Sequence, residues 1–283
     1  MAAEAYALHE GAFGTAIVLE LQADLVAHAH SETQIAFWLG GSRACARVGS
    51  ETVYYSEDVA LGANAFESHD MTLLDNSGSC LFLAFMISSD WLAQRECARG
   101  RKFRLPSPHI PIDANLRQSC WRVLDLILSG GDARASVDDE VERLLEVAIE
   151  SASALPSDKK GGLGISTDHR LRAAIAHMRD NVSAKATIDE IATKVGLSRA
   201  HFFALFRDQL NTTPQVFWSA VKVEEAMRRV AQGGALTEVA LDLGFSAPGN
   251  FSRFFKEHTG VSPSIFRRAV REPLPATVTG FPH

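Results

Sequence analysis

One sequence pattern occurs twice in the C-terminal part of this chain and constrains the fold more than any other feature. In each copy, a Glu-Ile/Val-Ala segment precedes Gly-Leu/Phe-Ser, two phenylalanines four residues apart, and Thr/Ser-Pro-x-x-Phe. The copies are offset by 48 residues through the Gly-Leu/Phe-Ser segment and by 49 residues from the first phenylalanine onward. Chance is a poor explanation for two such copies, so we expect two structural units of the same kind. The copies run from Glu190 to Phe217 and from Glu238 to Phe266.

Each copy predicts a helix, a tight turn that contains glycine, and a second helix, which is the layout of a helix-turn-helix. Glycine suits the turn because the chain must leave helical dihedral angles there, often at positive φ. Thr187 and Glu190 match a capping box that would open the first helix. Apolar residues between Pro214 and Gln232 recur on one helical face, which predicts a long helix that joins the two units.

The charge of the chain is unevenly distributed. Residues 1–167 carry a net charge of −10 and residues 168–272 a net charge of +4, within a total of −6. Phosphate binding depends on the local patch and not on the total charge. The C-terminal part can therefore bind nucleic acid, whereas the acidic part is not expected to do so alone.

The first ninety residues predict short β-strands. Runs of aliphatic, aromatic and β-branched residues alternate with clusters of Gly, Asn, Asp and Ser, a spacing that favours a sandwich or barrel over βαβ units. The predicted strands are residues 16–19, 34–39, 52–55 and 80–87.

Two amphipathic helices are predicted next, over residues 116–128 and 137–149, and the short connection between them favours an antiparallel pair. The following segment, SASALPSDKKGGLGIS, has the composition of a flexible linker. We therefore divide the chain into a first domain (1–152), a linker (153–167), a helical domain (168–272) and a tail (273–283).

Composition and segment lengths exclude several classes of protein. The chain is 46% hydrophobic and 22% charged, unlike disordered, collagen-like or disulfide-rich proteins. No apolar run approaches the ~18–20 residues of a membrane-spanning helix, and the N-terminus lacks a secretory leader. The four cysteines form no C-x-x-C motif, so neither a zinc site nor a redox pair is indicated. We expect a cytoplasmic protein without membrane contact.

Residues 168–270 resemble the tandem helix-turn-helix domain of the AraC/XylS family of bacterial transcription regulators. The second unit is closest to the family signature, from Thr237 to Ser246 and from Asn250 to Pro263. The resemblance covers just over a third of the chain. It implies two domains: an N-terminal cupin-like β-barrel with two following helices, and an all-α tandem helix-turn-helix domain.

The family resemblance also implies a function. It predicts a sequence-specific regulator of transcription, an activator rather than an enzyme, which is controlled by a small-molecule effector in the N-terminal domain. Its partners would be double-stranded DNA, RNA polymerase and a second copy of the chain, with no cofactor. A metal-dependent cupin enzyme fused to helices remains an alternative. Because Ala200 and Ala204 stand where the family often reads bases, a sensor that binds a protein instead of DNA is a third possibility.

The first recognition helix is expected to span residues 199–209, with Phe202, Leu205 and Phe206 in the core. Ala200 and Phe203 would then face the groove, where apolar side chains can contact only thymine methyl groups. Phe203 could equally pack under a neighbouring helix. Arg199 and Arg207 are candidates for phosphate contacts.

The second recognition helix offers polar side chains. Arg253 is the best candidate for a bidentate pair with guanine, the alternative being a solvent-exposed arginine without a role. We expect this unit to supply polar base readout and the first to supply shape and phosphate contacts. The outward residues of the second unit are Asn250, Ser252, Arg253 and Lys256.

Histidines in the N-terminal domain suggest a ligand site. His28-x-His30 with Gln34 resembles the first cupin motif, and His69 could take the place of the histidine in the second motif. Glutamine replaces the carboxylate of that motif, and the proline-glycine elements are missing. Three imidazoles could still hold a divalent metal with an open position, but the family resemblance implies that such histidines more often line a polar pocket, which is what we expect here. Trp38 could stack on a ligand or belong to the core. The arginine pairs 43/47 and 95/99 could grip phosphates or remain solvated.

Overall fold

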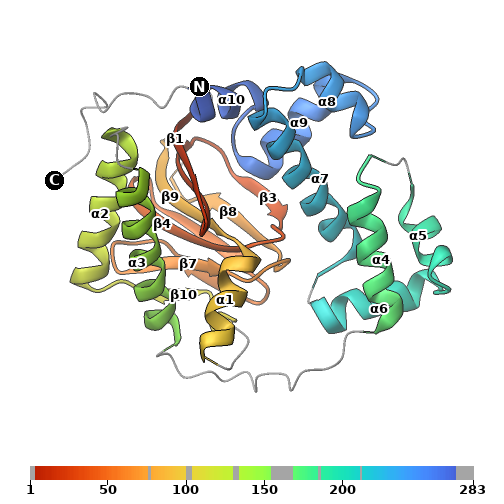
Figure 1. Ribbon diagram of the computed structural model, residues 1–283, viewed down its shortest axis with the longest axis horizontal. Helices are drawn as coiled ribbons and strands as arrows, with labels where there is room; N and C mark the ends of the chain where they lie inside the picture. Colours follow the sequence, from red (N-terminus) through yellow and green to blue (C-terminus); the bar gives the residue numbers. More distant parts are fainter. Residues whose placement is uncertain are drawn as a thin grey trace.

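The computed structural model describes residues 4–75, 78–99, 104–129, 134–153, 168–183, 186–210 and 212–271. The predicted tail (273–283) and, apart from Ser153, the predicted linker (153–167) lie outside these residues. Figure 1 shows a strand-rich part with two packed helices on one side, and a helical part that curves around the other side and the top. None of the described helices is both long and apolar enough to span a bilayer.

The strand-rich part consists of two antiparallel sheets. Residues 80–87, predicted as a strand, form a central strand that pairs on both sides. Nearly all of its side chains are buried. In spatial order, the six-stranded sheet contains β1 (Glu4–Gly11), β2 (Gly14–Leu21), β9 (Cys80–Ile87), β4 (Thr33–Gly41), β7 (Val59–Ala63) and β10 (His109–Pro111). The four-stranded sheet contains β3 (Leu25–His28), β8 (His69–Leu73), β5 (Ala44–Val48) and β6 (Glu51–Tyr54).

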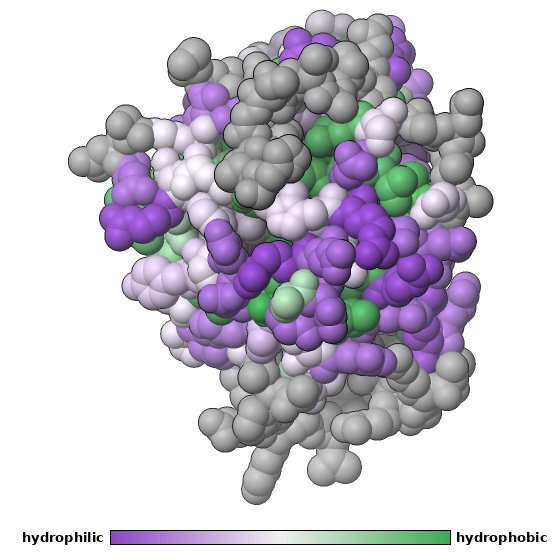
Figure 2. All heavy atoms as spheres, turned by 90° about the vertical axis from the view of Figure 1, so that its left-hand side faces the viewer, coloured by the Kyte–Doolittle hydropathy of each residue, from purple (hydrophilic) through white to green (hydrophobic). Residues whose placement is uncertain are grey.

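Three helices follow the sheets: α1 (Ser89–Arg99), α2 (Ala114–Ser129) and α3 (Arg134–Ser153). The predicted pair, α2 and α3, packs on the six-stranded sheet, and the apolar stripes of both helices belong to the same core as that sheet. The face of the molecule on that side is largely hydrophilic, with small hydrophobic patches (Figure 2). The stripes are therefore buried within the protomer and are not free for a second copy of the chain.

The helical part confirms the two repeated units. Its helices are α4 (His169–Asp180), α5 (Ile188–Lys194), α6 (Arg199–Leu210), α7 (Pro214–Ala231), α8 (Leu236–Asp242), α9 (Pro248–Thr259) and α10 (Pro263–Arg271). The pairs α5/α6 and α8/α9 form the two helix-turn-helix units, and α7 is the predicted connecting helix. Gly196 and Gly244 have φ angles of 72° and 79°, as the turn requires. The capping box of Thr187 and Glu190 is also present.

The second helix-turn-helix unit packs directly on the strand-rich part. Helix α10 lies along β1, and α9 lies against β3. The two parts share one apolar cluster that includes Leu21, Phe255 and Phe266. At Gly260 the approach is so close that an added Cβ would lie 2.3 Å from Leu21 Cδ2.

The first unit is held by an aromatic contact. Phe66, in the loop between β7 and β8, stacks on Phe217 of α7 with a centroid separation of 4.3 Å. The guanidinium of Arg179 on α4 lies 5.7 Å from the centre of the Phe66 ring. Phe66 has a φ of 61°, an uncommon value for a residue with a bulky side chain. The strand-rich part thus contacts the second unit directly and, through Phe66, the helices α4 and α7 that pack against the first unit.

Candidate DNA-binding surface and effector pocket

Helix α6 separates buried and exposed faces as its sequence predicts. Phe202 and Phe206 are fully buried and Leu205 is nearly so. Ala200 and Arg207 are exposed on the other side of the helix. Among the described residues, Arg207 has no ion-pair partner, so its guanidinium is available to an anion.

Arg199 and Phe203 contact each other on the exposed side of α6. The Arg199 guanidinium lies 4.9 Å from the centre of the Phe203 ring and also pairs with Asp189 of α5. Phe203 is half-buried. It is therefore neither part of the core nor a freely projecting side chain, and Arg199 is partly engaged within the protein.

Helix α9 presents polar side chains along its exposed face. Asn250, Arg253 and Lys256 are exposed, and Ser252 is half-buried. The Asn250 side-chain amide donates to Ser246 Oγ at 2.9 Å, and Arg253 Nη2 makes a long contact of 3.5 Å with Asn250 Oδ1. Pro248 occupies the first turn, where its missing N–H is not needed. These side chains provide donors and acceptors on one face of the helix.

The same side of α9 borders the strand-rich part. A groove beside the helix is lined by Arg253, Lys256 and Glu257 on one side and by the loop of residues 22–25 on the other. DNA that approaches α9 must therefore share space with this loop.

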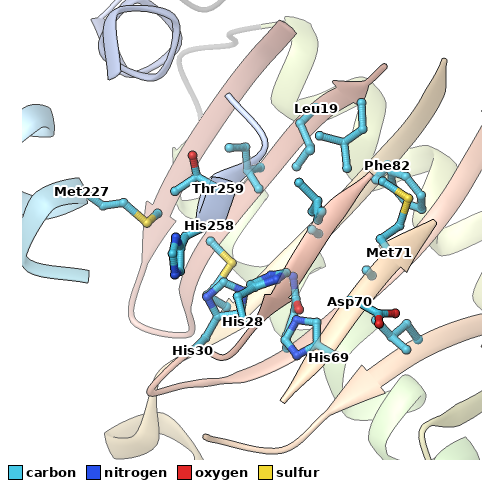
Figure 3. Close-up of a pocket in the computed structure, with 18 of the residues that line it drawn as sticks. Leu19, His28, His30, His69, Asp70, Met71, Phe82, Met227, His258 and Thr259 are labelled. Atoms are coloured by element: carbon cyan, nitrogen blue, oxygen red, sulfur yellow. The ribbon is translucent and has the colours of Figure 1, made fainter. Parts of the chain in front are cut away.

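A pocket lies between the inner faces of the two sheets and the helices α7 and α9 (Figure 3). It has a volume of about 70 Å³, enough for a few water molecules or a small ligand, since one water needs roughly 10–15 Å³. Most of its wall is aliphatic or aromatic. The polar groups that line it are His28, His30, Gln34, Tyr55, His69, Asp70, His258 and Thr259.

Three of the four predicted ligand residues converge in this pocket. The ring centroids of His28 and His69 are 4.4 Å apart, and His30 lies 5.0 Å from His28 and 5.3 Å from His69. Trp38 is not among the lining residues. It is half-buried against the core, and its Nε1 donates to the Ser42 carbonyl at 3.2 Å. Of the two roles considered for Trp38, a position against the core therefore fits the structure better than stacking on a ligand in this pocket.

Hydrogen bonds fix the orientation of two of these rings. His28 Nδ1 donates to the Val26 carbonyl at 2.8 Å, and His69 Nδ1 donates to the Glu67 carbonyl at 3.0 Å. This arrangement leaves each Nε2 with a lone pair. His69 Nε2 and Gln34 Oε1 are buried acceptors that have no partner among the described residues.

Burial keeps the three imidazoles neutral. Desolvation lowers the pKa of His28 well below its usual range, with a further decrease from His69 and His30. Desolvation and the neighbouring histidines lower the pKa of His30 to about 3, and desolvation also lowers the pKa of His69. At neutral pH the site thus presents uncharged imidazole nitrogens that can donate an electron pair.

One wall of the pocket comes from the helical part, a contact that no sequence pattern predicts. Met227 of α7 and His258 at the end of α9 line it. His258 Nδ1 donates to the Phe254 carbonyl at 2.8 Å, and burial lowers the pKa of His258. Figure 3 shows the His258 ring directed towards His28 and His30, with His69 farther away.

The arginine pairs do not form a phosphate site at this pocket. Arg43 pairs with Asp75 and Arg47 with Asp70. Arg95 pairs with Glu142 and Glu146 of α3. The Arg99 side chain lies outside the described residues. The charges of the three described arginines are thus matched by carboxylates, in agreement with a structural role.

Comparison with known proteins supports the assignment of the helical part. A family model described as a helix-turn-helix domain matches residues 191–269. The chain is 26% identical over 107 residues to a raffinose operon transcriptional regulatory protein of Pediococcus pentosaceus, covering 38% of this chain and 39% of that protein. It is 29% identical over 150 residues to the HTH-type transcriptional regulator ArgR of Pseudomonas aeruginosa, covering 50% and 44%. The chain thus spans about two fifths of the length of these relatives.

Solved structures resemble the whole architecture. The apo form of ToxT from Vibrio cholerae superposes with a TM-score of 0.58 and 11% identity, over 90% of this chain and 97% of that one. ToxT bound to an unsaturated fatty acid gives a TM-score of 0.53 and 10% identity, over 89% and 95%. At this identity the likeness concerns the fold, a strand-rich domain followed by a helical one. The sequence repeat, the two structural units and the family match agree that the C-terminal region of this chain is a helix-turn-helix domain.

Proposed function

We propose that this chain is a sequence-specific DNA-binding regulator of transcription, controlled by a small molecule in the strand-rich domain. The carrying observation is the pair of helix-turn-helix units joined by α7, each with one recognition helix and a glycine turn. A single rigid connecting helix fixes the separation of α6 and α9. Two such helices suit successive major-groove segments on one face of DNA.

The two units take different parts in this proposal. Arg199 and Arg207 on α6 contact phosphates, and Ala200 and Phe203 meet thymine methyl groups or the groove wall. On α9, Arg253 pairs with a guanine, supported by the side chains of Asn250, Ser252 and Lys256.

The effector site is the pocket that His28, His30 and His69 line. We infer that the two sheets are a cupin-like domain with an unclosed barrel, in which the pocket takes the usual central position. The mostly apolar wall and the few polar groups are typical of small-molecule sites. ToxT, which shares the fold, has a structure with an unsaturated fatty acid bound. The small pocket here favours a small effector or one that displaces α7 and α9 as it enters.

Regulation would follow from the position of the pocket. Because α9 closes it, an effector that changes the pocket also changes the position of a recognition helix. We propose an activator that contacts RNA polymerase and acts in the cytoplasm as a homodimer. The dimer contact would use the outer faces of α2 and α3, where Trp121, Leu126 and Val147 are half-buried, since their apolar stripes are already buried. Sedimentation of the full chain tests this, with Trp121→Ala expected to weaken association.

Mapping of bound DNA across the genome tests the function directly. We expect discrete sites, and a shift assay on those sites in which binding weakens as salt rises. Binding that no DNA sequence supports, together with capture of a defined protein partner, would favour the sensor without DNA binding. Turnover of a substrate by the metal-loaded protein would favour the cupin enzyme.

A further inference from the structure

The ring nitrogens of His28, His30 and His69 lie closer together than a polar pocket lining requires. One ring nitrogen from each of His28, His30 and His69 lies within 4.8 Å of the other two. His69 Nε2 is buried without a partner, and so is Gln34 Oε1 in the same pocket. Lone pairs of nitrogen and oxygen thus face one small space, and the described residues supply no hydrogen-bond donor to the two buried atoms.

We propose that His28, His30, His69 and His258 bind one divalent transition-metal ion, which joins the strand-rich domain to recognition helix α9. His28, His30 and His69 of the strand-rich domain form the site, and His258 completes it from the helical domain. The metal site is inferred from the geometry of the pocket alone. Only its expected effect on DNA binding depends on the function proposed above.

The spacing of the rings suits such an ion after a small contraction. Zinc–nitrogen bonds of 2.0–2.1 Å in a tetrahedral site place two ligand nitrogens about 3.4 Å apart. The three nitrogens in the sheets lie within 4.8 Å of one another, so side-chain rotations close the difference. His258 faces His28 and His30 across the pocket (Figure 3) but lies outside this close group of three, so the proposal requires it to approach by a movement of its side chain or of α9.

The hydrogen bonds of the rings are those of metal ligands. A metal-binding histidine usually donates its other ring N–H to a carbonyl or carboxylate, which fixes the tautomer. His28, His69 and His258 each donate Nδ1–H to a backbone carbonyl, at 2.8, 3.0 and 2.8 Å. In all three, the lone pair is therefore on Nε2. Residues from two domains share one tautomer around one pocket.

The donor set also selects the class of metal. The nearby carboxylates are engaged elsewhere: Glu67 accepts from the Asn64 backbone and side chain, and Asp70 pairs with Arg47. Imidazole donors suit zinc, nickel, copper and iron, whereas magnesium and calcium need oxygen ligands. The geometry points to a transition metal and excludes the hard cations.

Binding would hold α9 against the sheets. His258 lies in the last turn of α9, and Arg253 and Lys256 on the same helix border the loop of residues 22–25. An ion shared between His258 and the sheet histidines keeps the recognition helix in this position. We therefore expect the metal to weaken binding to operator DNA.

The test uses full-length protein without a histidine tag, stripped of metal. We expect one Zn²⁺ per chain, a Co²⁺ visible spectrum of the tetrahedral type, and X-ray absorption that reports imidazole nitrogens at about 2.0 Å. Mg²⁺ and Ca²⁺ should not compete. The X-ray absorption measurement uses the wild type, so it does not depend on whether a variant folds.

Variants assign the ligands. His69→Gln and His30→Asn should each lower Zn²⁺ affinity by at least ~100-fold, because loss of a supporting contact alone costs 10–100-fold. His169→Asn, an exposed histidine on α4, is the matched control and should bind as the wild type does. Circular dichroism verifies folding of each variant. Weak, multiple or oxygen-coordinated metal, or affinity unchanged in His69→Gln, would overturn the site.

His258→Asn separates the inter-domain contact from the site in the sheets. It should lower Zn²⁺ affinity and abolish the effect of Zn²⁺ on binding to a mapped DNA site. If both properties match the wild type, His258 is not a ligand and the inter-domain contact is refuted. If Zn²⁺ binds as expected but no specific DNA is found, the metal site stands and the proposed function fails.

Discussion

Arg253 and Arg207 are both exposed on recognition helices, yet their surroundings differ. Arg253 sits mid-helix beside the Asn250 side chain, among polar neighbours. Arg207 is in the last turn of α6, beyond apolar outward residues. The first environment suits an oriented contact to a base edge, and the second suits a phosphate, which requires charge rather than a fixed direction.

We therefore expect Arg253→Ala to weaken binding to the cognate site by about 1–3 kcal/mol and to relax preference at one base pair. Arg207→Ala should weaken cognate and altered sites equally and reduce the slope of log K against log salt by about one. Titrations at several salt concentrations, on the cognate site and single-base variants, measure both. Uniform weakening by Arg253→Ala with altered base preference in Arg207→Ala would reverse the assigned roles.

The ligand residues show which contacts a sequence can reveal. His28 and His30 are two residues apart, and His69 was found only by likeness to a motif. His258 lies about 190 residues beyond His69, on a helix whose pattern is explained by another role. Trp38 lies four residues along β4 from Gln34, roughly 13 Å away at the rise of a strand, and packs against the core, the second of the two roles considered for it. A pocket formed by two domains can be predicted only if the way they pack together is known. The hydrophobic periodicity of the sequence does not carry that information.

At the scale of helices, the two units differ in how their first helices begin. Helix α5 opens with the capping box of Thr187 and Glu190. Helix α8 opens at Ala235, which makes no side-chain cap, although Glu238 stands in the position that Glu190 has in α5. One substitution, Ala235→Ser, would supply the missing half of the motif.

We expect Thr187→Ala to destabilise α5 by about 0.5–2 kcal/mol and Ala235→Ser to stabilise α8 by up to ~1 kcal/mol. Hydrogen exchange of the amides in the two helices measures each local effect. Ala235→Gly serves as the control, because it alters the same position without adding a hydroxyl. Equal protection of α8 in Ala235→Ser and the wild type would mean that the serine hydroxyl does not reach the N3 amide.

The elements that the sequence predicted best are long and strongly periodic. Strand β9, helix α7 and the repeated units have the predicted bounds to within a residue or two, because burial of one face or of both dictates their pattern. The predicted strands also leave out β1, β7 and β10, of which β1 has eight residues. Strands β3, β5 and β8, likewise not predicted, have only four or five residues and mix polar with apolar side chains. Their strand conformation depends on pairing within the four-stranded sheet, which is tertiary information.

At the scale of the whole molecule, contact with the sheets restrains both units. Phe66 stacks on Phe217 and so connects the loop that ends at His69 to the first unit. Phe66→Ala removes this contact. Since aromatic pairs contribute about 0.5–1.5 kcal/mol beyond burial, release of the unit should increase DNA affinity roughly 2- to 10-fold.

Equilibrium titration of the full chain on a mapped site measures this change, and hydrogen exchange in α4 and α7 reports the loosened contact. Tyr54→Ala is the matched control, because Tyr54 is an exposed aromatic on β6 of the same domain. Looser contact without any gain in DNA affinity would show that the docking of the first unit does not oppose DNA binding.

The arrangement of α6, α7 and α9 makes a geometric prediction about the bound DNA. Each chain should protect two successive major-groove segments about one helical turn (~34 Å) apart, because α7 fixes the distance between the recognition helices. Hydroxyl-radical footprinting of one chain on a single half-site measures the pattern. Protection confined to one groove segment would contradict it.

The place of His258 has a consequence for measurements on the pocket itself. A side chain in the last turn of recognition helix α9 lines the cavity. Binding of a ligand in the cavity and binding of operator DNA to the helix are therefore thermodynamically linked. If occupancy lowers operator affinity by some factor, the operator must lower the affinity for the occupant by the same factor. The operator is then itself an effector of this site. An affinity measured on the free protein does not describe the chain that occupies a promoter, and the ratio of the two affinities gives the coupling between the domains.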